Sequence, residues 1–273
     1  MKFEYCDNLI RDFLKVIKKP IVKKGAKYHT GIDLGTACVV VCVLNEEGLP
    51  VAGAYQYADV VKDGMVVDYM GAVKIVREMK AHIEKQLKTE LIYAAAAIPP
   101  GTTLLDSGAI RNVAESADFE ITCVLDEPTA ANEVLKIQNG AIVDIGGGTT
   151  GISILKDGQV VYVADEPTGG THFSLVVAGA YKMVYNEAEL FKRDINNHKE
   201  LMAVLKPVIE KVSTIISRHI KGYDCEEIVL VGGTACLTGI EDIVADRVGI
   251  FTHKPENPMF VTPLGIALSC KNL

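Results

Sequence analysis

The most informative stretch of the sequence is IVDIGGGTTGISIL, residues 142–155. An apolar run leads to Asp144 and Ile145, three consecutive glycines follow, and after Thr-Thr-Gly the chain continues with Ile, Ser, Ile and Leu. β-Branched and other apolar residues favour strands, and glycines between two such runs favour a tight reversal of the chain. The pattern predicts two antiparallel strands joined by a glycine loop, with Asp144 at the end of the first strand.

The same design occurs earlier in the chain, at GIDLGT, residues 31–36. There Asp33 ends an apolar run, and a second apolar run follows over residues 38–44. Each hairpin leads into another turn that contains a glycine, at Gly48 and at Gly158. An internal repeat of this kind indicates two similar α/β lobes, and we expect a ligand to bind in a cleft between them.

The repeat divides the chain into four segments. We expect an N-terminal amphipathic helix with a basic linker over 1–27, a first lobe over 28–140, a second lobe over 141–258, and a C-terminal helix over 259–273 that returns to the first lobe. In the second lobe, a helix over 198–221 should break or begin near Pro207, because proline disrupts helix interiors. The N-terminal helix has one apolar stripe, formed by Leu9, Ile10, Phe13, Leu14 and Ile17. This stripe either covers the protein's own core or docks in a groove on a partner.

Composition excludes several classes of protein. The 28 Lys and Arg residues against 35 Asp and Glu give a net charge of −7, which argues against binding to nucleic acid or anionic lipid. The apolar run 38–44 is too short to cross a membrane, and the N-terminus lacks the pattern of a secretory leader. The 7 cysteines are an odd number without a C-x-x-C motif, so we expect reduced thiols and a cytoplasmic protein.

The two glycine loops suit a polyphosphate with a metal ion. Glycine lets backbone N–H groups approach an anion closely, and consecutive free N–H groups form a concave phosphate site. A carboxylate beside that site needs a divalent cation between itself and the phosphate, so Asp33 and Asp144 suit Mg²⁺ held through water. Thr36 and Thr149 add hydroxyl donors. The alternative is that each motif is only a glycine-containing turn.

A competing motif lies inside the second loop. Residues 146–151 match G-x-G-x-x-G, with Asp165 and Glu166 downstream, as in a dinucleotide-binding fingerprint. That fingerprint must open a helix. Here the following residues predict a β-hairpin, so we reject this interpretation.

Three further segments carry candidate site residues. In DEPTAA, residues 126–131, Asp126 is suited to cap a helix, and Glu127 could orient a water molecule that attacks a γ-phosphate. In VLVGGT, residues 229–234, a glycine pair between a strand and a helix could support a flat ring. Glu189 and Lys192 lie one turn apart on a helix, and their alternative role is an ordinary surface ion pair.

Taken in order, these motifs resemble the actin/hexokinase/DnaK-type ATPase superfamily. GIDLGT, DEPTAA, residues 142–155 and VLVGGTACLTGI (229–240) are similar to its phosphate-1, connect-1, phosphate-2 and adenosine motifs. The resemblance covers almost the whole chain after about residue 28. It implies an actin-like ATPase fold of two duplicated ribonuclease-H-like lobes that face a nucleotide cleft, with both insertion subdomains reduced.

The resemblance also assigns roles residue by residue. Asp33 and Asp144 resemble the aspartates that hold Mg²⁺ through water, and Glu127 resembles the acidic residue near the attacking water. The phosphate contacts correspond to Gly35, Thr36, Ala37, Gly146, Gly147, Gly148 and Thr149. The adenosine contacts correspond to Gly232, Gly233, Thr234, Glu189 and Lys192. The implied cofactors are ATP or ADP with Mg²⁺.

Within the superfamily, the stretches 57–77, 124–131, 143–152 and 260–269 resemble the EutJ family of chaperonin-like ethanolamine-utilisation proteins. This implies a cytoplasmic, microcompartment-associated protein without nucleic-acid or membrane partners. Its slow ATPase activity and lobe closure would gate binding to ethanolamine-utilisation enzymes or shell proteins, with helix 9–17 as a docking element.

The chain departs from the family pattern at two places, and the first of them favours slow turnover. The interval from Ala58 to Met70 contains only one basic residue, Lys62, and we assign no lysine to the γ-phosphate. Cys236 stands where the DnaK-type pattern has an arginine that stacks on adenine. The alternatives are a nucleotide-gated scaffold or reactivating factor that does not hydrolyse ATP, and a small-molecule kinase on the same fold.

Overall fold

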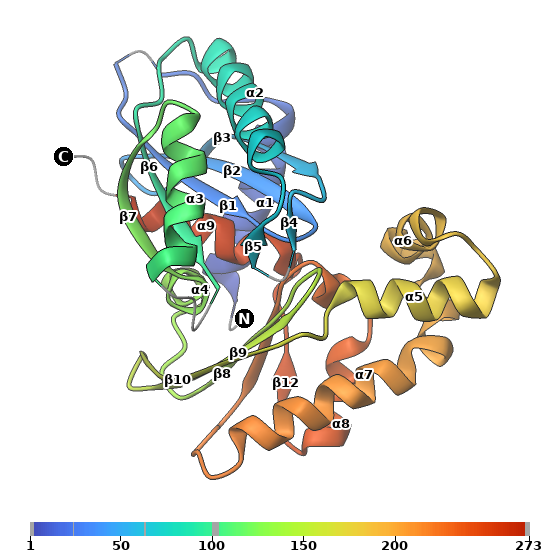
Figure 1. Ribbon diagram of the computed structural model, residues 1–273. Helices are drawn as coiled ribbons and strands as arrows, with labels where there is room; N and C mark the ends of the chain where they lie inside the picture. Colours follow the sequence, from blue (N-terminus) through green and yellow to red (C-terminus); the bar gives the residue numbers. More distant parts are fainter. Residues whose placement is uncertain (1–2, 24, 63, 100–103, 271–273) are drawn as a thin grey trace. The chain divides into compact units, whose positions relative to one another are not determined.

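The computed structural model describes residues 3–23, 25–62, 64–99 and 104–270. The chain forms two compact units (Figure 1). The first unit comprises Met1–Lys136 and Phe260–Leu273, and the second comprises Ile137–Met259. Each unit is built around its own sheet of five strands.

In the first sheet, three antiparallel strands continue into two parallel ones. Its strand order is β3-β2-β1-β6-β7. β1 pairs antiparallel with β2 and parallel with β6, and β7 extends the parallel part. The strands are β1 (Tyr28–Leu34), β2 (Cys38–Asn45), β3 (Pro50–Tyr57), β6 (Tyr93–Ile98) and β7 (Glu120–Asp126).

The second sheet repeats this topology. Its order is β10-β9-β8-β11-β12, with β8 antiparallel to β9 and parallel to β11. The strands are β8 (Gly140–Ile145), β9 (Thr150–Lys156), β10 (Gln159–Glu166), β11 (Ile228–Val231) and β12 (Thr252–His253). The predicted duplication is therefore confirmed. Because β9 follows the glycine loop directly, the rejection of a dinucleotide fingerprint is also correct.

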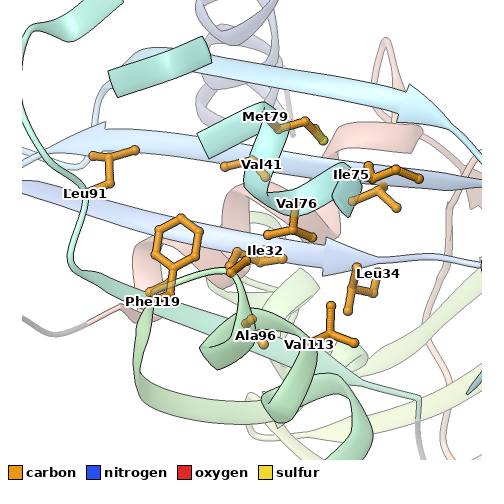
Figure 2. Packing of buried hydrophobic residues seen from close by; sticks show 14 of the residues in the cluster. Ile32, Leu34, Val41, Ile75, Val76, Met79, Leu91, Ala96, Val113 and Phe119 are labelled. Atoms are coloured by element: carbon orange, nitrogen blue, oxygen red, sulfur yellow. The ribbon is translucent and has the colours of Figure 1, made fainter. Parts of the chain in front are cut away.

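One face of the first sheet is covered by α2 (Tyr69–Leu87) and α3 (Leu104–Ser116). α2 begins where the side chain of Asp68 accepts a hydrogen bond from the Gly71 N–H, and it ends at Lys88 in a left-handed conformation. Its apolar stripe packs against alternate residues of the strands, such as Ile32 and Val41 (Figure 2). Val73, Val76, Met79, Ile83 and Leu87 form the stripe and are buried, as their spacing predicts.

The other face of this sheet is covered by α1 (Glu4–Lys18), α4 (Glu127–Leu135) and α9 (Val261–Ser269). α1 contacts β3 and α9, Phe13 is fully buried, and its ring centroid lies 5.3 Å from that of Phe260. The interpretation of helix 9–17 as a docking element is therefore wrong, because its apolar stripe covers the protein's own core. Val16 is buried as well, whereas Leu14 and Ile17 are half-buried.

The second unit carries its helices on a core shared with β8, β9 and β11. They are α5 (Gly170–Tyr181), α6 (Tyr185–Arg193), η1 (Ile195–Asn197), α7 (His198–Ile220), η2 (Thr234–Cys236) and α8 (Ile240–Val248). The predicted break near Pro207 is wrong, since α7 runs through it. Ala203, whose carbonyl loses its helical hydrogen bond to Pro207, is exposed, so water can replace that donor.

Within the interval from Ala58 to Met70, β4 (Val61–Lys62) pairs antiparallel with β5 (Met65–Val66). η3 (Pro258–Phe260) precedes α9. Among the described helices, none is both long and apolar enough to span a membrane.

Candidate functional site

In the first unit, the predicted site residues lie at one edge of the sheet. β1, β6 and β7 are parallel, so their carboxyl ends share that edge. Asp33 is the penultimate residue of β1, and Glu127 directly follows β7. The Gly35 N–H donates to the Cys38 carbonyl at 3.1 Å, which closes a turn with Thr36 and Ala37 at its centre.

Of the two adjacent carboxylates at the end of β7, Asp126 has a structural role. It accepts hydrogen bonds from the Thr129 N–H at 2.9 Å and from the Thr129 hydroxyl at 2.8 Å. The predicted helix cap is confirmed. Both carboxylate oxygens of Asp126 are used in this cap, so Glu127 is the better candidate for chemistry on a ligand.

In the second unit, the glycine loop closes in the same way as the first. The Gly146 N–H donates to the Thr149 carbonyl at 3.0 Å. Asp144 pairs with Gly151 across this hairpin, as Asp33 pairs with Val40 across the first one. The two threonines do not occupy equivalent positions, however. When the two hairpins are compared by strand register, Thr36 corresponds to Gly147, and Thr149 corresponds to Cys38.

The carbonyl groups of the second loop are bound by α5 and η2. The Gly146 carbonyl accepts hydrogen bonds from the Gly170 N–H at 2.9 Å and from the Thr234 hydroxyl at 2.8 Å. The Gly147 carbonyl accepts from the Thr171 N–H at 2.7 Å and from the Thr171 hydroxyl at 3.0 Å. In a trans peptide the N–H points opposite to the carbonyl. The N–H groups of Gly147 and Gly148 therefore both point away from α5, which is the arrangement of an anion-binding concavity.

Asp144 lies against the backbone of Gly232. β11 runs parallel to β8, with Val231 in register with Asp144, so the chain leaves the sheet beside this carboxylate. A Cβ atom at Gly232 would lie 2.2 Å from the Asp144 Oδ1, and the φ angle of Gly232 is +90°. Only glycine fits here, both sterically and conformationally. The structure thus brings the phosphate-2 and adenosine motifs together within the second unit.

Glu189 and Lys192 form a buried ion pair on α6, with the Lys192 Nζ 2.8 Å from the Glu189 Oε2. The Lys192 side chain is only 6% exposed, and its ammonium also donates to the Gly170 carbonyl at 2.9 Å. Arg193 donates to the other Glu189 oxygen at 2.7 Å, and the Ser174 hydroxyl donates to Glu189 as well. The interpretation as an ordinary surface ion pair is therefore wrong. The role of Glu189 and Lys192 in binding adenosine stays a prediction.

The environment determines the charge of this pair. Burial would raise the pKa of Glu189, but Lys192, Ser174 and Arg193 together hold that pKa below its ordinary value. Burial lowers the pKa of Lys192, although Glu189 opposes the shift. Glu189 is the anionic partner at neutral pH, and the pair fixes α6 to the first turn of α5.

The pair Gly169–Gly170 also belongs to the candidate site, although the sequence motifs did not predict it. A Cβ atom at Gly170 would lie 2.5 Å from the Thr234 Oγ1, 3.2 Å from the Lys192 Nζ and 3.3 Å from the Gly146 carbonyl oxygen. Gly170 is therefore the point where the glycine loop, the adenosine motif and α6 meet. Its signal is present in the sequence, because Gly-Gly-Thr follows a strand at 169–171 as it does at 232–234.

Comparisons with known proteins identify the family of the chain. A family model described as "Type IV pilus assembly protein PilM" matches residues 130–259. The ethanolamine utilization protein EutJ of Salmonella typhimurium (strain LT2) is 45% identical over 240 residues, which are 88% of this chain and 84% of that protein.

Solved structures give the same result. The crystal structure of EutJ from Carboxydothermus hydrogenoformans matches with a TM-score of 0.93 and 46% identity, over 98% of this chain and 99% of that chain. MreB5 of Spiroplasma citri bound to AMPPNP matches with a TM-score of 0.71 and 19% identity, over 89% and 95% of the two chains. The fold is that of the actin-like ATPases, and the chain belongs to the EutJ family of ethanolamine utilisation proteins.

Proposed function

We propose that this protein binds Mg-ATP and Mg-ADP and hydrolyses ATP slowly. The observation that carries the proposal is the pair of N–H groups at Gly147 and Gly148, which point to the same side of a loop that begins two residues after Asp144. Two such donors suit phosphate oxygens, and a neighbouring carboxylate suits the metal that accompanies them. The fold neighbour MreB5, which was solved with AMPPNP, supports the same ligand class.

In this proposal, both units provide residues that contact the nucleotide. Gly35 to Ala37 and Gly146 to Thr149 would hold the phosphates, and Asp33 and Asp144 would hold Mg²⁺ through water. When bound, this ion neutralises charge on the phosphates. Glu127 would orient the attacking water. Gly232, Gly233 and Thr234, with Glu189 and Lys192, would support adenosine.

The biological role that we propose is a nucleotide-dependent switch. Closure of the two units on the nucleotide would gate binding to ethanolamine-utilisation enzymes or microcompartment shell proteins, and the protein would act in the cytoplasm. Membership of the EutJ family supports this setting. Because the stripe of α1 is buried in the first unit, we assign partner binding to other surfaces.

A second candidate is a scaffold that binds nucleotide without useful hydrolysis. It is favoured by the small hairpin of β4 and β5, where Lys62 is the only basic residue among those described. The deciding experiment is phosphate release from Mg-ATP, with ADP binding measured on the same sample. Slow release supports the ATPase, binding without release supports the scaffold, and no binding contradicts both.

The switch is tested by co-sedimentation with purified ethanolamine-utilisation enzymes and shell proteins, with ATP, with ADP and without nucleotide. We expect at least one partner to sediment differently with ATP than with ADP. Equal sedimentation of every partner under all three conditions would contradict the gating.

A further inference from the structure

His198, the first residue of α7, is buried between two parts of the candidate site. It is 5% exposed. The Thr238 N–H donates to its Nδ1 at 3.1 Å, and the Thr238 hydroxyl lies 3.1 Å from the same nitrogen. On the other side of the ring, Nε2 lies 3.1 Å from the Lys192 carbonyl. One imidazole thus links the end of α6 to the segment 232–239.

Only one form of the ring makes both backbone contacts. Nδ1 must be unprotonated to accept from the Thr238 N–H, and Nε2 must carry the proton to donate to the Lys192 carbonyl. This is the neutral Nε2–H tautomer. Protonation of Nδ1 would place its N–H against the N–H of Thr238, and the hydrogen bond would be lost.

The surroundings of the ring, above all its burial, favour the neutral form. Burial, followed by the nearby Lys254 ammonium, lowers the pKa of His198, while the Lys192 carbonyl and Asp194 act in the opposite direction. Lys254 approaches from the segment after β12 and pairs with Glu241 of α8 at 2.8 Å. It also donates to the carbonyl groups of Ala235 at 3.0 Å and Leu237 at 2.6 Å, so it holds the same segment.

The two linked elements carry the candidate adenosine residues. α6 carries Glu189 and Lys192, and the segment 232–239 begins with Gly232, Gly233 and Thr234. We propose that neutral His198 is a positioning residue that keeps α6 and the segment 232–239 in register, so that protonation of His198 weakens nucleotide binding. The expected effect on nucleotide binding rests on the proposed function. The hydrogen bonds by which His198 links α6 to the segment 232–239 exist without a nucleotide.

The link is tested first without nucleotide, by amide hydrogen exchange of Thr238 across pH. We expect protection of this amide, corrected for the intrinsic exchange rate, to fall as His198 titrates below the ordinary imidazole range. His198→Asn retains an oxygen near the position of Nδ1 and does not titrate. In this variant, protection of the Thr238 amide should therefore not depend on pH in this range. The control is His219→Gln, at a histidine that bonds Tyr162 and Glu166 elsewhere in the unit. Unchanged protection of Thr238 in the wild type across His198 titration would overturn the inference.

The second measurement is ADP affinity from about pH 7.5 down through the pH at which the Thr238 amide loses its protection, in the wild type and in His198→Asn. The comparison cancels the titration of ADP itself. We expect the wild-type affinity to fall by about fivefold more than that of the variant, the loss expected for one hydrogen bond. Superimposable pH profiles would overturn the role of His198 in nucleotide binding. Absence of ADP binding at neutral pH would instead contradict the proposed function, and hydrogen exchange would still decide whether the link exists.

Discussion

At the scale of single residues, Asp144 provides the sharpest test of metal dependence. Its carboxylate lies against Gly232, and only Ile145 separates it from the glycine loop. If Asp144 acts through Mg²⁺, Asp144→Ala should weaken nucleotide binding by about tenfold or more with Mg²⁺ and far less without it. Titration calorimetry with and without the metal measures both values. Asp157→Asn, in the exposed turn between β9 and β10, is the control. Equal losses with and without Mg²⁺ would contradict the assigned role.

Glu127 is predicted to act on the attacking water rather than on ATP binding. Glu127→Ala should slow phosphate release by roughly 10²-fold, while the affinity for ATP stays nearly unchanged. Single-turnover phosphate release gives the rate, and calorimetry gives the affinity. Glu120→Gln, at the exposed start of β7, should leave both unchanged. A large loss of affinity with an unchanged rate would show that Glu127 only binds the ligand.

A substitution at Gly170 tests whether the glycine loop, the segment at Thr234 and α6 pack together in the second unit. Gly170→Ala would place a methyl group 2.5 Å from the Thr234 Oγ1, so we expect a loss of about 1–3 kcal/mol in the free energy of unfolding. Gly179 on the same helix has no atom within 4 Å of its Cβ position. Gly179→Ala should therefore stabilise the protein by about 0.5–1 kcal/mol through helix propensity. Urea unfolding compares the two, and losses of equal size would contradict the packing at Gly170.

At the scale of secondary-structure elements, α1 is predicted to be part of the first unit's core. Phe13 is 0% exposed, so Phe13→Ala should cost about 3–5 kcal/mol of unfolding free energy and lower the melting temperature. Tyr5→Ala, at a residue of the same helix that is 51% exposed, should change stability little. A melting temperature of Phe13→Ala equal to that of the wild type would contradict the packing of α1 in the core of the first unit.

The hairpins around Asp33 and Asp144 could be predicted because their determinants are local. Strand residues on both sides of a glycine loop specify the element, its turn and the position of the carboxylate. The packing of α1 could not be predicted, because an apolar stripe does not specify which surface covers it. The burial of Lys192 was missed for a similar reason, since its partner carbonyl at Gly170 lies on another helix. The helix break predicted at Pro207 does not occur, because solvent can replace the hydrogen bond that proline removes.

At the scale of the whole molecule, the duplicated topology supports two different sets of functional groups. The first unit provides Asp33 and Glu127 at the edge of its parallel strands. In the second unit the loop has Gly147 and Gly148 where the first has Thr36 and Ala37, and the adenosine motif packs against it. Under the proposed function, the two sets would serve different parts of one nucleotide, because phosphate chemistry and base recognition need different groups.

We propose that each chain binds one Mg-nucleotide and that this binding needs residues of both units. Calorimetric titration of the full chain with Mg-ADP, in the wild type, Asp33→Ala and Asp144→Ala, tests this proposal. We expect one saturable site per chain in the wild type, with affinity lowered by about tenfold or more in each variant. No saturable binding in the wild type, or wild-type affinity in either variant, would contradict it.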